Sequence, residues 1–481
     1  MSLARALVPV IAFSAAAHAV ASWDSFISYD NEFVDPDIIL SKPWTKDHRT
    51  ADAAQSIVAW ADALYNQGPW SVTYKNIAAP TGDKHDYMSW APYWWPDCSN
   101  VGNKTELTPQ QIWVTCPYKD RDGQFVPDVR LINDTGAFAG MSDAVFYNTL
   151  AWQITGKEAY AKKAVTDMRT WFIDEDTFMN PNLNFSQVHR GPGVQKGDHC
   201  GVLDMKTISK VGSAILLMRK AKFAGWTADD DTKFNSWAKQ FIGWLETHPF
   251  GHDEGTAPNN HGTYFYNTMV TCQILTGNMT GARHYLDRYF TTQYLNQIDA
   301  NGEQPYEVVR SRRYHYRAYG LGATIINAKL AQYIGYNVWN LTTSKGGTIQ
   351  KAADWAMTFD PASTNETTSA PAEELYQHVA AVASVYGDPD GKYASFLASK
   401  NPDYPQSPFF LWNQPLALPA NYTVSRTVNV TGEPGGTIEP KEGQALGRES
   451  AGVHGALMPT LTIVLAVVIF QLARFAVAHR V

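Results

Sequence analysis

The sequence is poor in charge and in cysteine, and it lacks the short motifs of several common enzyme classes. Charged residues make up 18% of its 481 positions, the formal net charge is −7, and there are four cysteines. A chain with net negative charge is not expected to bind nucleic acid, so a polyanionic ligand would require a local basic cleft. The sequence has no glycine-rich phosphate loop, and Gly140–Ala144 lacks the second glycine of a nucleophile elbow. Nucleotide-dependent enzymes and elbow-type hydrolases are therefore not indicated.

Long alternations of apolar and polar residues, which are typical of strands, are also missing. Apolar residues instead recur at helical spacing, and glycine or proline often follows, as at Gly156, Pro249 and Gly277. Helices are expected near residues 51–66, 140–155, 157–171, 203–223, 229–247, 261–275, 281–296, 316–334, 348–358, 372–386 and 392–399. The pattern predicts one large all-α domain over residues 22–420. Paired antiparallel helices without a strict repeat favour an incomplete α/α toroid over a regular solenoid.

Both ends of the chain carry the pattern of targeting signals. Arg5, the apolar run Ala6–Ala17 and a small-x-small site predict a signal peptide over residues 1–21. Residues 421–455 are rich in Thr, Gly and Pro and are expected to form a glycosylated stalk. Residues 456–481 form an apolar tail, which is either a GPI-anchor signal or a transmembrane helix. The expected location is the extracellular cell surface, with the tail as the one contact with a membrane.

Secretion makes the four cysteines candidates for disulfides. Cys98–Cys116 and Cys200–Cys272 are the preferred pairs among three possible pairings. Passage through a eukaryotic secretory pathway also agrees with sequons at Asn103, Asn133, Asn184, Asn278, Asn340, Asn365, Asn421 and Asn429.

The stretch Pro305–Leu321 is the most unusual part of the chain. Its second half brings four arginines together with three tyrosines and a histidine, namely Arg310, Arg312, Arg313, Arg317, Tyr314, Tyr316, Tyr319 and His315. Buried cations must each be paired, so this composition would build a poor core. It suits a site that binds a carboxylate and transfers a proton beside it. The alternative is the solvated basic start of a helix.

A second candidate is the run Asn259-Asn260-His261. Either asparagine can cap the helix that follows, which would be a structural role. Capping does not account for His261, which stands on the first turn, where the helix dipole disfavours a charged imidazolium. A neutral histidine beside amide donors suits proton transfer next to a carboxylate.

Two irregular segments offer further binding residues. Lys84, His85, Tyr87 and Trp94 belong to an aromatic stretch, and a cation beside exposed rings can bind an acidic sugar. The alternative is a loop that its aromatic residues anchor in the core. The polar segment 182–204 adds the cleft candidates Gln187, His189 and His199, each of which could equally be structural.

Together these motifs resemble the alginate-lyase-type family of uronate polysaccharide lyases. The resemblance follows the order KHDYMSWAPYWWPD, NLNFSQ, NNHGTYF and NGEQPYEVVR, and it covers most of residues 50–335. It implies an α/α toroid that cleaves acidic polysaccharides by β-elimination without a nucleotide or redox cofactor. It also implies catalytic roles for Asn260, His261, Arg310 and Tyr316. Tyr314 and Tyr319 are the alternatives for the tyrosine.

The implied chemistry is consistent with these side chains. Arg310 and Asn260 would neutralise the uronate carboxylate, so that negative charge can develop at C5. Neighbouring cations would favour the Tyr316 phenolate as a base. In mannuronate or glucuronate the C5 proton and O4 lie on the same ring face, so Tyr316 alone could act as both base and acid. In guluronate they lie on opposite faces, with His261 as base and Tyr316 as acid. Asn259, Arg313 and Tyr314 are expected to contact the substrate.

Three other interpretations remain at this stage. A glycoside hydrolase would need two carboxylates, for which Asp174–Asp176 or Glu303 and Glu307 are available. A wall-polysaccharide binder would keep the aromatic loop and the arginines without needing a Tyr–His pair. The run His248, His252, Asp253 and Glu254 has a spacing compatible with a metal, although no metal is expected.

Overall fold

The computed structural model describes residues 31–102, 107–364, 366, 372–414, 416–424 and 433–435. Its α-helices are α1 (Pro36–Leu40), α2 (Pro43–Lys46), α3 (Ala51–Tyr65), α4 (Pro109–Thr115), α5 (Asp134–Thr155), α6 (Glu158–Phe172), α7 (Ile208–Lys220), α8 (Ala228–Thr247), α9 (Pro249–Thr256), α10 (Asn260–Leu275), α11 (Met279–Thr291), α12 (Tyr294–Gln297), α13 (Arg313–Tyr333), α14 (Ile349–Ala356), α15 (Tyr376–Tyr386) and α16 (Lys392–Lys400). Short strands are β1 (Met88–Trp90), β2 (Trp94–Pro96), β3 (Tyr118–Asp120) and β4 (Phe185–Val188), and the 3-10 helix η5 spans His199–Met205.

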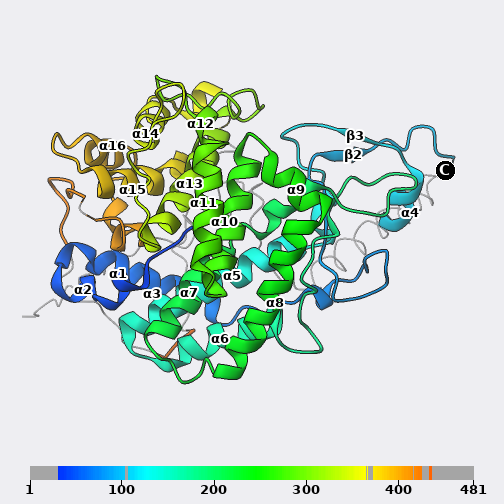
Figure 1. The fold of residues 1–481 in the computed structure, drawn as a ribbon, viewed down its shortest axis with the longest axis horizontal. Coiled ribbons are helices and arrows are strands. Elements are labelled where there is room, and N and C mark those ends of the chain that lie inside the picture. Colours follow the sequence, from blue (N-terminus) through cyan, green and yellow to red (C-terminus); the bar gives the residue numbers. More distant parts are fainter. Residues whose placement is uncertain are drawn as a thin grey trace, which may run out of the picture.

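The helices follow one another around the molecule, and the last ones return beside the first (Figure 1). Short connections such as Gly156 turn the chain back on itself, so that α5 packs against both α6 and α3. Helix α10 packs against α7, α11 and α13. One large hydrophobic cluster runs through these helices. The all-α toroid expected from the sequence is confirmed.

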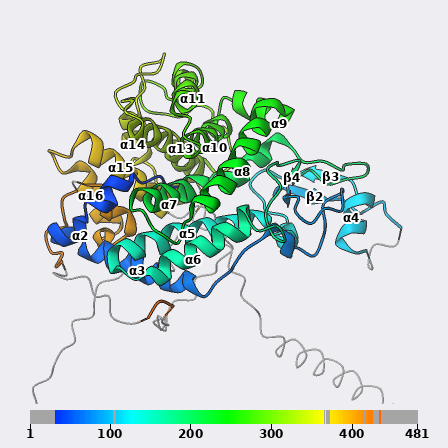
Figure 2. The same ribbon diagram turned by 60° about the horizontal axis from the view of Figure 1, so that its bottom comes forward.

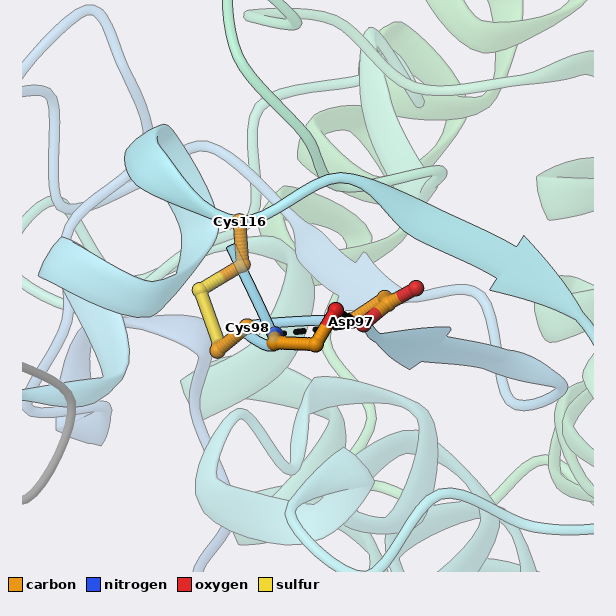
Figure 3. Close-up of a disulfide and its surroundings, with 4 residues drawn as sticks. Asp97, Cys98 and Cys116 are labelled. Atoms are coloured by element: carbon orange, nitrogen blue, oxygen red, sulfur yellow. Dashed lines mark hydrogen bonds between the residues drawn. A yellow bond between two sulfur atoms is a disulfide. The ribbon is translucent and has the colours of Figure 1, made fainter. Parts of the chain in front are cut away.

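A lobe projects from one end of this ring, where Figures 1 and 2 show β2, β3 and α4 together. We call residues 94–120 the disulfide lobe. Strands β2 and β3 pair antiparallel, with Trp94 opposite Asp120. The predicted disulfide Cys98–Cys116 is confirmed and ties the end of β2 to the end of α4 (Figure 3). Strand β1, just before the lobe, pairs in parallel with β4.

The other predicted disulfide, Cys200–Cys272, is wrong, because both cysteines are free. Cys200 lies beside His261, on the first turn of α10. Cys272 lies near the other end of the same helix, about 16 Å farther along at a rise of 1.5 Å per residue. A disulfide cannot span that distance.

The first described residues are buried where the ring closes. Glu32 accepts hydrogen bonds from Lys329 on α13 at 2.6 Å and from Trp412 at 2.9 Å. Asn31 donates to Ser209 on α7 and to Asn267 on α10. The N-terminal segment therefore joins the early, middle and late parts of the chain.

Several predictions fall on residues outside the described ranges. They are the signal peptide, most of the stalk, the apolar tail and the sequons at Asn103, Asn365 and Asn429. Within the described ranges, no helix combines the length and hydrophobicity that a membrane span requires.

Candidate active site

The N-terminus of α10 positions two of the predicted residues. Asn259 is the N-cap and accepts a hydrogen bond from the His261 backbone, so its role here is structural. Asn260 is buried, and both its backbone N–H and its Nδ2 donate to the Glu307 carboxylate, at 2.7 and 2.6 Å. Its Oδ1 is buried without a hydrogen-bond partner among the described residues. The side-chain amide of Asn260 is therefore held in one orientation, while its Oδ1 can still accept a hydrogen bond.

Glu254 on α9 connects two histidines at this point. It is fully buried and accepts hydrogen bonds from Nδ1 of His261 at 2.7 Å and from Nδ1 of His199 at 2.6 Å. Because each Nδ1 carries the donated proton, the lone pair of each neutral ring lies on Nε2. The hydrogen bond to Glu254 raises the pKa of His199. His261 is thus oriented as a base, with a carboxylate behind it.

The arginine-rich stretch forms the start of α13. Glu366 accepts from the backbone N–H groups of Tyr314 and His315 and so caps the helix. This cap fixes the position of Tyr316, whose ring lies 4.1 Å from the Arg310 guanidinium and 5.7 Å from that of Arg312. A tyrosine and two cations therefore meet, as the sequence predicted.

The residues on either side of the disulfide lobe bind the two arginines beside Tyr316. Asp122 accepts from Arg310 at 2.8 Å, and Tyr93 accepts from Arg312 at 2.8 Å. Burial opposes ionisation of Asp122, but the hydrogen bond and charge of Arg310, together with hydrogen bonds from Ser311, outweigh it and lower the pKa of that carboxyl. Arg310 is thus held by an anion that a substrate carboxylate could replace.

Arg310 and Arg312 favour the Tyr316 phenolate, as expected, but burial opposes them more strongly. Burial raises the pKa of Tyr316, Tyr93 adds to the rise, and Arg310 and Arg312 only partly oppose it. Tyr316 is only 5% exposed, so loss of water outweighs attraction to the two guanidinium groups. The resting side chain is the neutral phenol.

The other residues of the stretch lie in different surroundings. Tyr314 is buried and donates to the carbonyl of Ala372. Arg313 is exposed, whereas Arg317 is paired with Glu303 at 2.7 Å. Tyr319 stacks on His315, with their ring centroids 5.3 Å apart. Of the three candidate tyrosines, Tyr316 is the one that both Arg310 and Arg312 approach.

The aromatic and polar segments meet through β1 and β4. Trp94 stacks on His189, with centroids 4.5 Å apart. Tyr87 is buried, and it donates to Asp204, as does Gln187 Nε2. Gln187 has a φ of 45°, a conformation that is rare outside glycine and often found at functional sites.

Lys84 and His85 lie at the start of the aromatic segment. His85 Nδ1 donates to the Phe178 carbonyl at 2.6 Å, and its ring packs on Phe178. The Lys84 side chain is exposed, and its carbonyl accepts from Lys75. The structure thus anchors this turn to the segment before β4.

Sequence reasoning missed several residues of the site. Asp122 is far in the sequence from Arg310, which it holds, so no local pattern identified it. Glu254 was named only as part of the run at 248–254, and its bonds to His199 and His261 were not predicted. Lys206 and Arg130 also face Asp204, and burial lowers the pKa of Lys206 to about 8. These two cations extend the basic character of the site. Their signal in the sequence was too weak, because neither belongs to a cluster of basic residues or to a recognisable motif.

The other interpretations find less support. Glu303 pairs with Arg317 and Glu307 holds Asn260, while Asp174, Glu175 and Asp176 are exposed. The candidate metal ligands in the run at 248–254 do not point toward one another. His248 accepts a hydrogen bond from the Phe250 backbone, and His252 is exposed. Glu254 bonds instead to His199 and His261.

Comparisons with known proteins agree with this geometry. The family model described as alginate lyase matches residues 71–368, which is more than half of the chain. The chain belongs to the alginate lyase family. The matched range includes the α10 and α13 residues, Asp122 and Glu254. The protein is therefore a polysaccharide lyase with a helical toroid fold.

Two solved structures of alginate lyases are similar to this chain. An alginate lyase from Bacteroides ovatus is 27% identical, with a TM-score of 0.69, over 80% of this chain and 99% of its own. Alginate lyase A1-III from Sphingomonas species A1 is 13% identical, with a TM-score of 0.42, over 72% of this chain and 91% of its own. No curated protein sequence matches the chain.

Proposed function

We propose that this alginate lyase family member cleaves 4-linked uronate polymers by β-elimination at the site formed by α10 and α13. The observation that carries the proposal is that the Arg310 guanidinium lies 4.1 Å from the Tyr316 ring and is held by Asp122, which follows the disulfide lobe. A guanidinium next to a phenol is the pair that a uronate requires, because one binds the carboxylate and the other transfers a proton.

The substrate carboxylate would replace Asp122 at Arg310. The second N–H of Asn260 would bind it too, since the first N–H is committed to Glu307. Both interactions strengthen as charge moves from C5 into the carboxylate, so they stabilise the transition state more than the bound substrate. Oδ1 of Asn260 then remains to accept a hydrogen bond from a sugar hydroxyl.

Proton transfer depends on the sugar. In guluronate, His261 Nε2 would take the C5 proton and the neutral Tyr316 would give its proton to O4. In mannuronate or glucuronate, Tyr316 would first have to lose its proton, and would then remove the C5 proton and return it to O4. Either route breaks the C4–O4 bond and leaves a 4,5-unsaturated uronate end.

Ultraviolet absorbance of that conjugated product tests the proposal. Polymannuronate, polyguluronate, glucuronan and hyaluronan would be compared, and we expect the absorbance to rise with at least one of them. Tyr316→Phe should lower kcat by about 10²–10⁴-fold with little change in Tm, because only the transferable proton is lost. Reducing ends that appear without absorbance would mean hydrolysis and contradict the proposal.

We also propose that the protein acts outside the cell, held by its C-terminal tail. The signal-peptide pattern, the sequons and the Cys98–Cys116 disulfide support this location. Phosphatidylinositol-specific phospholipase should release a GPI-anchored form from cells. Release by detergent alone would indicate a transmembrane tail instead.

A further inference from the structure

Cys200 brings a thiol to the two histidines that share Glu254. Its Sγ lies 3.9 Å from His199 Nε2. That sulfur and one ring nitrogen of each of His199 and His261 all lie within 4.8 Å of one another. The three side chains come from the start of η5 and the start of α10, two elements that pack together.

The carboxylate behind the rings is the second relevant observation. Glu254 is fully buried and accepts a hydrogen bond from Nδ1 of each histidine, at 2.6 Å for His199 and 2.7 Å for His261. Histidines that bind metals through Nε2 usually donate their other N–H to a carboxylate or carbonyl in this way. One glutamate thus orients two potential metal ligands together.

The distances suit a small tetrahedral ion. Zn²⁺ bonds of about 2.0–2.3 Å to nitrogen and sulfur place neighbouring ligand atoms roughly 3.3–3.8 Å apart. The observed separations of up to 4.8 Å need to close by no more than about 1.5 Å. Thiolate and imidazole donors favour Zn²⁺ over Ca²⁺ or Mg²⁺. Asp198, whose carboxylate lies 3.8 Å from His199 Nε2, adds negative charge beside the three ligands.

We propose that His199, Cys200 and His261 bind one Zn²⁺, and that the bound ion inhibits the lyase. Binding replaces the thiol proton with the metal ion, and that proton is released to solvent. The ion would occupy the His261 lone pair, which is then no longer available for proton transfer. Inhibition rests on the function proposed above, whereas binding does not.

Cobalt(II) tests binding without using activity. The chelator-treated protein is titrated with Co²⁺, and thiolate-to-cobalt charge-transfer absorption is recorded. We expect absorption that saturates at one equivalent in the wild type and is absent in Cys200→Ser. Cys272→Ala is the matched control, because it removes the other free cysteine, and it should keep the absorption. No thiolate absorption in the wild type, or equal absorption in Cys200→Ser, would overturn the site.

Zinc tests the inhibition. Added Zn²⁺ should reduce turnover of the wild type and of Cys272→Ala, and a chelator should restore it. Cys200→Ser should have normal turnover without zinc and need at least tenfold more zinc for the same inhibition. If cobalt binds but zinc leaves a measurable turnover unchanged, the inhibitory role is wrong. If no polymer is cleaved at all, the proposed function fails while the cobalt result stands.

Discussion

At the scale of single residues, Tyr316 shows burial and charge acting in opposite directions. Arg310 and Arg312 lower the pKa of its phenol, but burial raises it by more, so the neutral form prevails. The side chain is ready to donate a proton and must be ionised before it can accept one. Its two proposed roles should therefore differ in their pH dependence.

We expect kcat/KM for polymannuronate to keep rising into the alkaline range, because that route uses the Tyr316 phenolate. With polyguluronate, where Tyr316 acts as the acid, the rate should level off at lower pH. Arg312→Gln removes a cation that favours the phenolate. It should shift the alkaline limb of the pH profile of kcat/KM to higher pH for polymannuronate, and not for polyguluronate. Initial rates across pH would measure both effects, and identical profiles for the two polymers would contradict this division of roles.

The sequence predicted which residue types gather at the site but not their protonation states. Asn260, His261, Arg310 and Tyr316 stand in short motifs, and the family resemblance of those motifs was enough to propose them as catalytic residues. The protonation of Tyr316 depends on burial by distant segments, which no local pattern contains. Glu254 was noticed only within a run that suggested metal ligands, and its actual partners are His199 and His261. Its role depends on tertiary packing.

At the scale of elements, the disulfide lobe and its flanking residues support the arginines. Tyr93 precedes the lobe and Asp122 follows it, and they bind Arg312 and Arg310. Trp90 and Trp113 pack in a small hydrophobic cluster that is separate from the main core. The lobe can therefore lose order without opening the helical ring.

Replacing both Cys98 and Cys116 with serine should raise KM several-fold and lower the main Tm only slightly. A disulfide that closes a loop of this size contributes about 3 kcal/mol, and here that contribution is confined largely to the lobe. Steady-state kinetics and calorimetry would show the difference. Asp122→Asn is a useful companion, because it weakens the hold on Arg310 and leaves the disulfide intact. A large fall in the main Tm would show that the lobe is part of the central folding unit.

Helices were predicted well where apolar periodicity was long, as in α6, α8 and α10. Helix α9 and the short strands were missed, because each is too short to show a period. The Cys200–Cys272 pairing failed because it came from the number of cysteines alone. Only the position of Cys272 along α10 shows that the two sulfurs are far apart.

At the scale of the whole molecule, Glu32 links the N-terminal segment of the helical ring to the late part of the chain. Its carboxylate bonds to Lys329 and Trp412, which lie about 300 and 380 positions later in the chain. Both Glu32 and Lys329 are largely buried. Removing the carboxylate would leave a buried ammonium group without its ion pair.

Glu32→Ala should lower the free energy of unfolding by about 3–5 kcal/mol, the usual cost of breaking a buried ion pair from one side. Turnover of the remaining folded enzyme should be unchanged, because Glu32 is distant from Tyr316 in the ring. Denaturant unfolding together with active-site titration would measure both quantities. Asp287→Ala, which breaks the exposed pair with Arg283, should cost less than about 1 kcal/mol. Equal losses for the two variants would refute the proposed role of Glu32.

The two ends of the long axis differ in a way that matters for attachment. Tyr422, near the end of the described chain, donates to Asp52 on α3. Helix α3 and the disulfide lobe lie at opposite ends of the molecule (Figures 1 and 2). A support coupled to α3, where Tyr422 docks, would therefore lie behind the enzyme and leave the lobe facing outward. Long polymer strands could approach the immobilised catalyst from the solution side without meeting the support.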